Sequence, residues 1–126
     1  MGNEATLGEL RGLIAAFVAA REWEGFHNPK DLALALSVEA SELLELFRWR
    51  GRKEVEEHLP ELMDRIAEEL ADVFIFGLSL ANAVSLDLSA AIIQKMEENE
   101  VRFPVEKYRG RAYGDWAKSS AGRNAS

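Results

Sequence analysis

Hydrophobic residues recur every three or four positions along most of the chain, which is the spacing of one face of an α-helix. This pattern predicts four long helices, over residues 7–24, 29–49, 61–83 and 88–101. No segment shows the alternation of hydrophobic and polar residues that is typical of strands. The sequence therefore predicts an all-α fold, a helical bundle of about four main helices.

Residues that start or end helices lie at most of these boundaries. Thr6, followed three positions later by a glutamate, fits a capping box, and Asn28 can cap the helix that begins at the next residue. Pro60 suits the first turn of the third helix, and Asp87 can cap the fourth. Gly25 is expected to end the first helix. The charged residues 52–58 are expected to form a short surface turn.

Two helices carry acidic residues on the face that should be buried. With Leu32 taken as zero, three other leucines of the second helix fall within about 40° of it. Glu39 lies at about −20° and Glu42 at about −80°. On the third helix, with Leu62 as zero, Glu69 lies at about −20° and Asp72 near −80°, again beside the apolar side chains.

An unpaired buried carboxylate is unfavourable, whereas several converging carboxylates can share a cation. Their oxygen atoms suit Mg²⁺, or Mn²⁺ in its place, better than zinc. The alternative interpretation is that these acids belong to ordinary solvated faces, because pairs of this spacing are common on helices.

Polar residues also share an apolar stripe on the fourth helix. With Leu88 as zero, Lys95, Asn99 and Arg102 lie within about 40° of it. Long Lys and Arg side chains can reach water from such a position, but the short Asn side chain cannot. His27 stands at a bend beside aromatic residues, a position from which loops often contribute function. The segment 74–76 is apolar nearly all round, which predicts packing against another subunit.

Composition narrows the class of protein. The chain has 126 residues, 48% of them hydrophobic, and no cysteine, so we expect one globular domain without disulfides or thiolate chemistry. A formal net charge of −7 argues against binding to a nucleic acid polymer. There is no stretch long enough for a membrane span and no signal peptide, so a cytoplasmic protein with no membrane partner is expected. We expect a leader at residues 1–5, a domain at 6–105 and a partly disordered tail at 106–126 that could cross a neighbouring subunit or cover the site.

The order of several short motifs resembles the MazG-like superfamily of all-α nucleotide pyrophosphohydrolases, and within it the dCTP pyrophosphatase branch. The resemblance covers roughly residues 10–105. It rests on the following words: Arg21-Glu22-Trp23-Glu24-x-Phe26-His27-x-Pro29, Glu39-x-x-Glu42-Leu43-x-Glu45-Leu46-Phe47-x-Trp49, Glu68-Glu69-Leu70-x-Asp72-Val73, and Lys95-Met96-x-x-Asn99-x-x-Arg102-Phe103-Pro104-Val105.

The resemblance implies a Mg²⁺-dependent enzyme that hydrolyses a nucleoside triphosphate to the monophosphate and pyrophosphate, works as a homodimer or homotetramer, and removes unwanted nucleotides. The metal ligands it implies are Glu39, Glu42, Glu69 and Asp72. The substrate-binding residues expected with them are Trp23, His27, Trp49, Phe76, Lys95, Asn99 and Arg102. The general base stays open: a ligand carboxylate such as Glu39 or Glu42, activation by the metal alone, or Glu45.

At two positions expected near the nucleobase, the sequence differs from the pattern of dCTP-preferring relatives. Phe76 stands where dCTP-preferring relatives tend to have tyrosine, and Ile14 stands where they present a polar group, so a pyrimidine or modified nucleotide is expected rather than cytosine in particular. A second hypothesis is a non-catalytic helical module for oligomerisation or partner binding, which predicts no metal affinity. A di-iron carboxylate bundle is disfavoured because neither histidine follows a helical motif glutamate by three residues.

Overall fold

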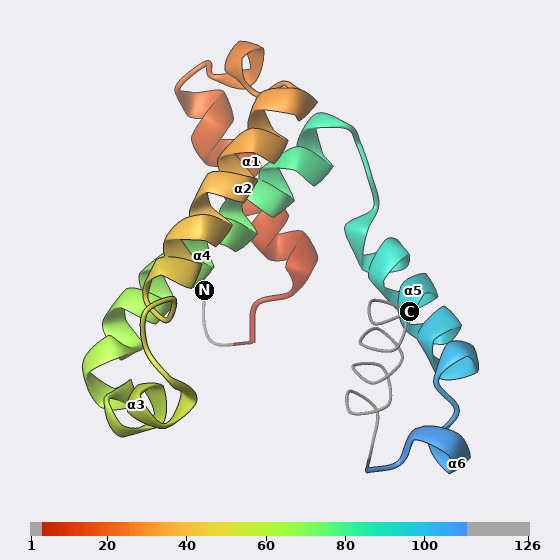
Figure 1. Cartoon of the computed structure of the whole chain (residues 1–126). Helices are drawn as coiled ribbons and strands as arrows, with labels where there is room; N and C mark the ends of the chain where they lie inside the picture. Colours follow the sequence, from red (N-terminus) through yellow and green to blue (C-terminus); the bar gives the residue numbers. More distant parts are fainter. Residues whose placement is uncertain (1–3, 111–126) are drawn as a thin grey trace. The chain divides into compact units, whose positions relative to one another are not determined.

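The computed structural model of the chain describes residues 4–110, and every regular element within them is helical (Figure 1). The all-α prediction and the four long helices are therefore confirmed. The elements in chain order are α1 (Leu7–Ala20), the 3₁₀ helix η1 (Glu24–Phe26), α2 (Pro29–Glu45), α3 (Arg52–Glu57), α4 (Leu59–Ala83), α5 (Leu88–Arg102) and α6 (Val105–Tyr108).

The chain divides into two compact units, Met1–Leu88 and Ser89–Ser126. In the first unit, α1, α2 and α3 all contact α4, and α2 lies along it (Figure 1). The buried core of this unit consists of Val18, Leu32, Leu46, Leu62, Leu78 and Ala81. In the second unit, the rings of Phe103 and Tyr108 meet edge to face, with centroids 5.2 Å apart, which fixes α6 against the end of α5. The proposed leader, domain and tail stay a prediction, and residues 111–126 of the tail lie outside the described residues.

The first helix ends at Ala20, four residues before the predicted end, and Gly25 does not terminate it. Glu22 adopts a positive φ of 54°, and its N–H donates to the carbonyl of Ala19. The N–H of Trp23 reaches back to the carbonyl of Val18, and the two bonds together form a Schellman motif. Sequence reasoning placed the end at glycine because glycine is the residue that usually adopts this conformation.

The second helix also ends early, at Glu45 rather than near Trp49. The N–H groups of Phe47 and Arg48 both donate to the carbonyl of Leu44, which tightens the chain into turns. The guanidinium of Arg50 donates to the carbonyl of Leu46 and satisfies a helix-end acceptor. The segment expected to be a surface turn contains a six-residue helix, α3.

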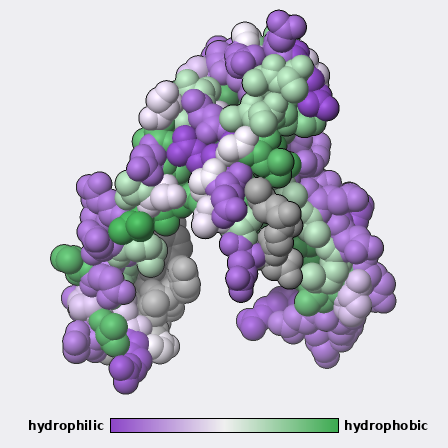
Figure 2. Space-filling model, turned by 180° about the vertical axis from the view of Figure 1, so that it is seen from behind, coloured by the Kyte–Doolittle hydropathy of each residue, from purple (hydrophilic) through white to green (hydrophobic). Residues whose placement is uncertain are grey.

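Much apolar surface remains exposed on the single chain, and Figure 2 shows patches of it among polar ones. On α4, Phe74 is 58% and Ile75 43% exposed, although a helix that is apolar on most sides would normally be covered. Among the described residues, no single helix is both long and apolar enough to cross a membrane, and only α4 and α5 taken together as a bent pair meet that test.

Candidate functional site

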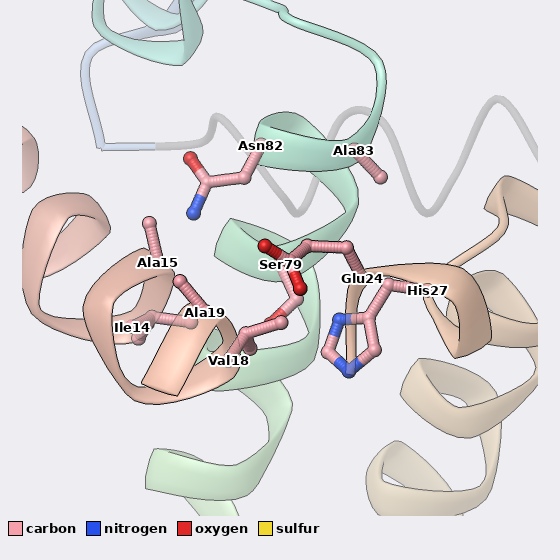
Figure 3. A pocket seen from close by; sticks show the side chains of 9 residues that line it. All are labelled: Ile14, Ala15, Val18, Ala19, Glu24, His27, Ser79, Asn82 and Ala83. Carbon is pink, nitrogen blue, oxygen red and sulfur yellow. The ribbon is translucent and has the colours of Figure 1, made fainter. Parts of the chain in front are cut away.

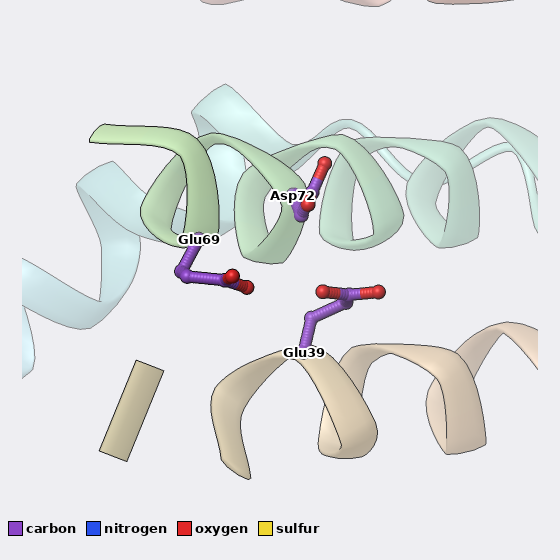
Figure 4. A group of neighbouring side chains, drawn as sticks. All are labelled: Glu39, Glu69 and Asp72. Carbon is purple, nitrogen blue, oxygen red and sulfur yellow. The ribbon is translucent and has the colours of Figure 1, made fainter. Parts of the chain in front are cut away.

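Three acidic side chains from two helices converge in the first unit. Glu39 extends from α2 towards Glu69 of α4, and Asp72 lies one turn further along α4 (Figure 4). One carboxylate oxygen from each of the three lies within 4.8 Å of the others. The three side chains are half-buried. The helical spacing that placed these acids on apolar faces thus brings them together in space.

The surroundings of this group disfavour negative charge. Burial raises the pKa of Glu39, and the carboxyls of Glu42, Asp72 and Glu69 raise it further. Burial also raises the pKa of Glu69, together with Glu42 and Asp72, while the nearby Arg65 partly opposes the shift. Glu42 is itself exposed, but it interacts with both Glu39 and Glu69. We call Glu39, Glu42, Glu69 and Asp72 the acid group.

The acid group fits a divalent cation. Within the described residues, Glu39 Oε2 and Glu69 Oε2 are buried without any hydrogen-bond partner. Buried polar atoms are nearly always satisfied, so two orphaned oxygens that face each other from different helices indicate a missing positive ligand. The donors are all carboxylate oxygens, which suit a hard cation such as Mg²⁺ and not a thiolate- or imidazole-seeking metal.

Glu45 lies apart from this convergence. Its carboxylate forms an exposed ion pair with Arg48, with 2.8 Å between oxygen and nitrogen. The guanidinium of Arg48 also lies over the ring of Trp49, 4.5 Å from the ring centroid, and Trp49 is 78% exposed. Both predicted site residues are therefore on the surface of the single chain, at the end of α2.

A cavity lies between α1, η1 and α4, further along α4 from the acid group. It consists of two adjoining hollows, of about 420 and 400 Å³, that share Ile14, Val18, His27 and Ser79. The polar hollow also includes Glu24 and Asn82 (Figure 3). The apolar hollow is completed by Leu13, Phe17, Trp23, Ile75 and Phe76. We call the two together the α1–α4 cavity; each hollow has the size of an ordinary small-molecule site.

The cavity contains three of the predicted substrate-binding residues: Trp23, His27 and Phe76. Phe76 follows Asp72 by four residues on α4, so it lies about 6 Å further along the same helix face. The ring of Trp23 packs edge to face on Phe17, with centroids 5.9 Å apart. The Schellman end of α1 therefore delivers Trp23 to the cavity wall.

The other predicted binding residues are on α5, in the second unit. Lys95 forms an exposed ion pair with Glu98 at 3.5 Å, and the Asn99 amide lies 3.7 Å from the sulfur of Met96. Arg102 lies over the ring of Phe103. Each of the three interacts with a neighbour on its own unit, and their role in binding stays a prediction.

Sequence reasoning missed two polar residues of the cavity, Glu24 and Ser79. Glu24 is part of the motif at residues 21–29, in which only Trp23 and His27 were predicted to bind substrate. Ser79 falls at about −100° when Leu62 is zero, close to Asp72 and Phe76, so the helical spacing already placed it on the same face of α4.

Comparisons with known proteins identify the family of the chain. Residues 34–115 match the MazG-like family. The chain is 42% identical over 125 residues to dCTP pyrophosphatase 1 of Rattus norvegicus and 41% identical to that of Mus musculus, in each case covering 96% of this chain and 74% of the relative. The structure superposes on that of a pyrophosphatase from Archaeoglobus fulgidus with a TM-score of 0.73 and 35% identity, covering 82% of this chain and 97% of the other. The chain belongs to the MazG-like family.

Proposed function

We propose that the protein is a nucleoside triphosphate pyrophosphohydrolase that cleaves the bond between the α and β phosphorus atoms and releases a nucleoside monophosphate and pyrophosphate. The observation that carries the proposal is the pair of buried, unpartnered oxygens of Glu39 and Glu69 that face each other between α2 and α4. The relatives named dCTP pyrophosphatase support a deoxynucleotide substrate of the dCTP type. The role proposed with it is the removal of unwanted nucleotides.

We assign Mg²⁺ to the acid group, with Glu39, Glu42, Glu69 and Asp72 as its ligands. When bound, the cation supplies positive charge that neutralises the triphosphate and acidifies water. The carboxylates hold this charge at the α2–α4 interface, where burial and the neighbouring carboxyls raise the pKa of Glu39 and of Glu69. The cation must therefore displace any proton that these two side chains carry. A carboxylate of the acid group is the better candidate for a general base than Glu45, because Glu45 is engaged with Arg48.

The α1–α4 cavity is assigned to the nucleobase and sugar, with Trp23, His27 and Phe76 as contacts. Its position one turn beyond Asp72 allows a nucleotide to reach it while the phosphates lie at the acid group. Trp49, Lys95, Asn99 and Arg102 are assigned to the substrate as well. The exposed apolar side chains of α4 support a homodimer or a tetramer of two dimers, in which a second chain covers them. A cytoplasmic location agrees with a nucleotide substrate.

The test is pyrophosphate release from a panel of deoxy- and ribonucleotides, with Mg²⁺, with Mn²⁺ and with EDTA. We expect release to require the cation and to fall below detection in Glu69→Gln. Glu68→Gln is the matched control, because Glu68 is the preceding residue of α4 and is exposed. Absence of release from every nucleotide by folded protein would contradict the proposal and favour the non-catalytic helical module.

A further inference from the structure

The guanidinium of Arg65, on α4, has no partner among the residues that the structure describes. It makes no hydrogen bond, ion pair or ring contact with them. The other five arginines of the first unit each donate a hydrogen bond to a side chain or to a backbone carbonyl: Arg11, Arg21, Arg48, Arg50 and Arg52. Glutamates stand four residues before Arg65 and three and four residues after it, at spacings that commonly form ion pairs on a helix. The side chain is nevertheless exposed and available to a ligand.

Arg65 lies on the face of α4 that carries the acid group. With Leu62 as zero, Arg65 falls at about −60°, between Glu69 at about −20° and Asp72 near −80°. It precedes Glu69 by four residues, so the two are about 6 Å apart along the helix. Its positive charge opposes the rise in the pKa of Glu69, which agrees with a short separation. Arg65 is also the one lysine or arginine of α4.

Arg65 and the α1–α4 cavity lie on opposite sides of the acid group. Phe76 and Ser79 of the cavity follow Asp72 on this face of α4, whereas Arg65 precedes Glu69. The proposed function places the base in the cavity and the cation at the carboxylates. A nucleoside triphosphate that lies along α4 in this direction brings its β and γ phosphates to the side of Arg65. These two phosphates are the part of the substrate that is released as pyrophosphate.

A guanidinium at this position suits the terminal phosphates. They carry most of the negative charge of the substrate, and the formal net charge of −7 on the chain opposes their approach. A guanidinium presents parallel N–H donors whose spacing matches two phosphate oxygens. The two lysines of the first unit are less well placed. Lys30 precedes Glu39 by nine residues of α2, about 14 Å, and Lys53 is on the separate helix α3.

We propose that Arg65 binds the β and γ phosphates of the nucleotide and stabilises the pyrophosphate that leaves. The inference rests on the proposed function, because it takes the acid group as the place of cleavage and the α1–α4 cavity as the base site. It also gives the substrate a direction along α4, with the base towards Ser79 and the terminal phosphates towards the beginning of the helix.

The first experiment measures inhibition of dCTP hydrolysis by pyrophosphate and by dCMP, in the full chain with Mg²⁺. We expect Arg65→Gln to raise the inhibition constant of pyrophosphate about tenfold or more, because hydrogen bonds between charged groups are lost, and to change that of dCMP by less than about twofold. Arg65→Lys should be intermediate, since lysine keeps the charge without the planar fork. Arg52→Gln is the matched control, because it removes the same charge from an exposed arginine that pairs with Glu56.

Calorimetric titration with Mg²⁺ alone separates a phosphate contact from a merely structural role. If Arg65 served only to offset the charge of Glu69, Arg65→Gln would tighten Mg²⁺ binding and leave the inhibition constant of pyrophosphate unchanged, which would overturn the inference. The inference instead predicts weaker pyrophosphate binding in Arg65→Gln, even though removal of a neighbouring positive charge favours the cation.

The outcomes for the inference and for the proposed function are distinct. Equal inhibition by pyrophosphate in wild type and in Arg65→Gln, with dCTP hydrolysed by both, contradicts the inference and leaves the proposed function intact. Calorimetric titration with pyrophosphate in the presence of Mg²⁺ tests the reverse case. If no nucleotide is hydrolysed and pyrophosphate binds more weakly to Arg65→Gln than to wild type, the proposed function fails while the assignment of Arg65 to pyrophosphate stands. Absence of pyrophosphate binding to wild type contradicts the inference.

Discussion

The acid group and the α1–α4 cavity lie on one face of α4 and are built from opposite kinds of side chain. The acid group includes Glu39 and Glu69, whose pKa values are raised by burial and by the neighbouring carboxyls. The cavity is lined mainly by hydrophobic side chains, with a few polar groups at one end. Along α4 the order is Glu69, Asp72, Phe76 and Ser79: charge, then an aromatic ring, then a hydroxyl. The proposed function puts the phosphates at the carboxylates and the base beside the aromatic ring.

The two regions also differ in what they contribute to the fold. The acid group opposes folding in the absence of a cation, because desolvation of several carboxylates is unfavourable. The cavity walls favour folding, because Val18 and the neighbouring apolar side chains bury surface between α1 and α4. A substitution in the acid group should therefore lower activity without lowering the stability of the cation-free protein. A substitution in the cavity wall should lower both activity and stability.

The largest effect is expected for Glu39→Gln, which keeps the shape of the side chain and removes its charge. We expect activity to fall by more than the roughly 10- to 100-fold lost when only a supporting partner of a metal ligand is changed. The cation-free protein should be at least as stable as wild type, because a buried charge has been removed. Steady-state pyrophosphate release and thermal unfolding in EDTA measure the two effects.

Glu45→Gln is the companion variant, since Glu45 is on the same helix but pairs with Arg48 on the surface. A loss of activity in Glu45→Gln as large as that in Glu39→Gln would contradict the assignment of the base to the acid group.

The next effect concerns the cavity wall. Phe76→Ala should raise KM by roughly 10- to 100-fold, because burial of a phenylalanine side chain against a ligand ring contributes roughly 1.5 to 3 kcal/mol. Phe74→Ala is the matched control two residues earlier, because Phe74 is exposed and does not line the cavity. The two should be compared at a protein concentration at which their oligomeric states agree. A KM that responds equally to both variants would show that the cavity does not hold the base.

The acid group also predicts a pH dependence of stability without the cation. The folded-state pKa values of Glu39 and Glu69 are raised above the ordinary value of 4.5, so the folded chain binds protons more tightly than the unfolded chain. This contribution to stability is complete below 4.5 and is lost as the pH rises through the raised pKa values. Thermal unfolding in EDTA should therefore show wild type losing stability over this range.

The double variant Glu39→Gln/Glu69→Gln should lose less stability over the same range. Added Mg²⁺ should stabilise wild type more at higher pH, because the ligands must be deprotonated to bind it. Wild type and double variant with parallel pH profiles in EDTA would contradict the raised pKa values.

The smallest effect is expected at the contact that holds α1 against α4. Asn82→Ala removes both hydrogen bonds to Arg11 and should lower the free energy of unfolding by about 1 to 2 kcal/mol. Asn82→Asp keeps the acceptor for Arg11 Nε and loses the donor, so its effect should be intermediate. Chemical denaturation measures both, and an Asn82→Ala variant as stable as wild type would show that the Arg11 pair does not stabilise the α1–α4 contact.

Helical spacing was enough to predict the four long helices and the convergence of Glu39, Glu69 and Asp72. The prediction was correct because the apolar face of an amphipathic helix packs against another helix, so a carboxylate on that face points at the neighbouring helix. The spacing also placed Ser79 on the face of Asp72, but only the folded chain shows that Ser79 lines the α1–α4 cavity. The same spacing places Glu45 at about −140° from Leu32, away from the apolar arc. Only the folded chain shows its ion pair with Arg48.

The sequence by itself determined the helical class, the acid group and the family, because these depend on short-range periodicity and on ordered motifs. The tertiary structure decided the α1–α4 cavity. Its walls come from α1, η1 and α4, and they meet because Glu22 adopts a left-handed conformation that ends α1 and turns Trp23 and Glu24 towards Ser79. A non-glycine residue in that conformation is held there by its surroundings rather than by its own preference, so the packed structure was needed to find it.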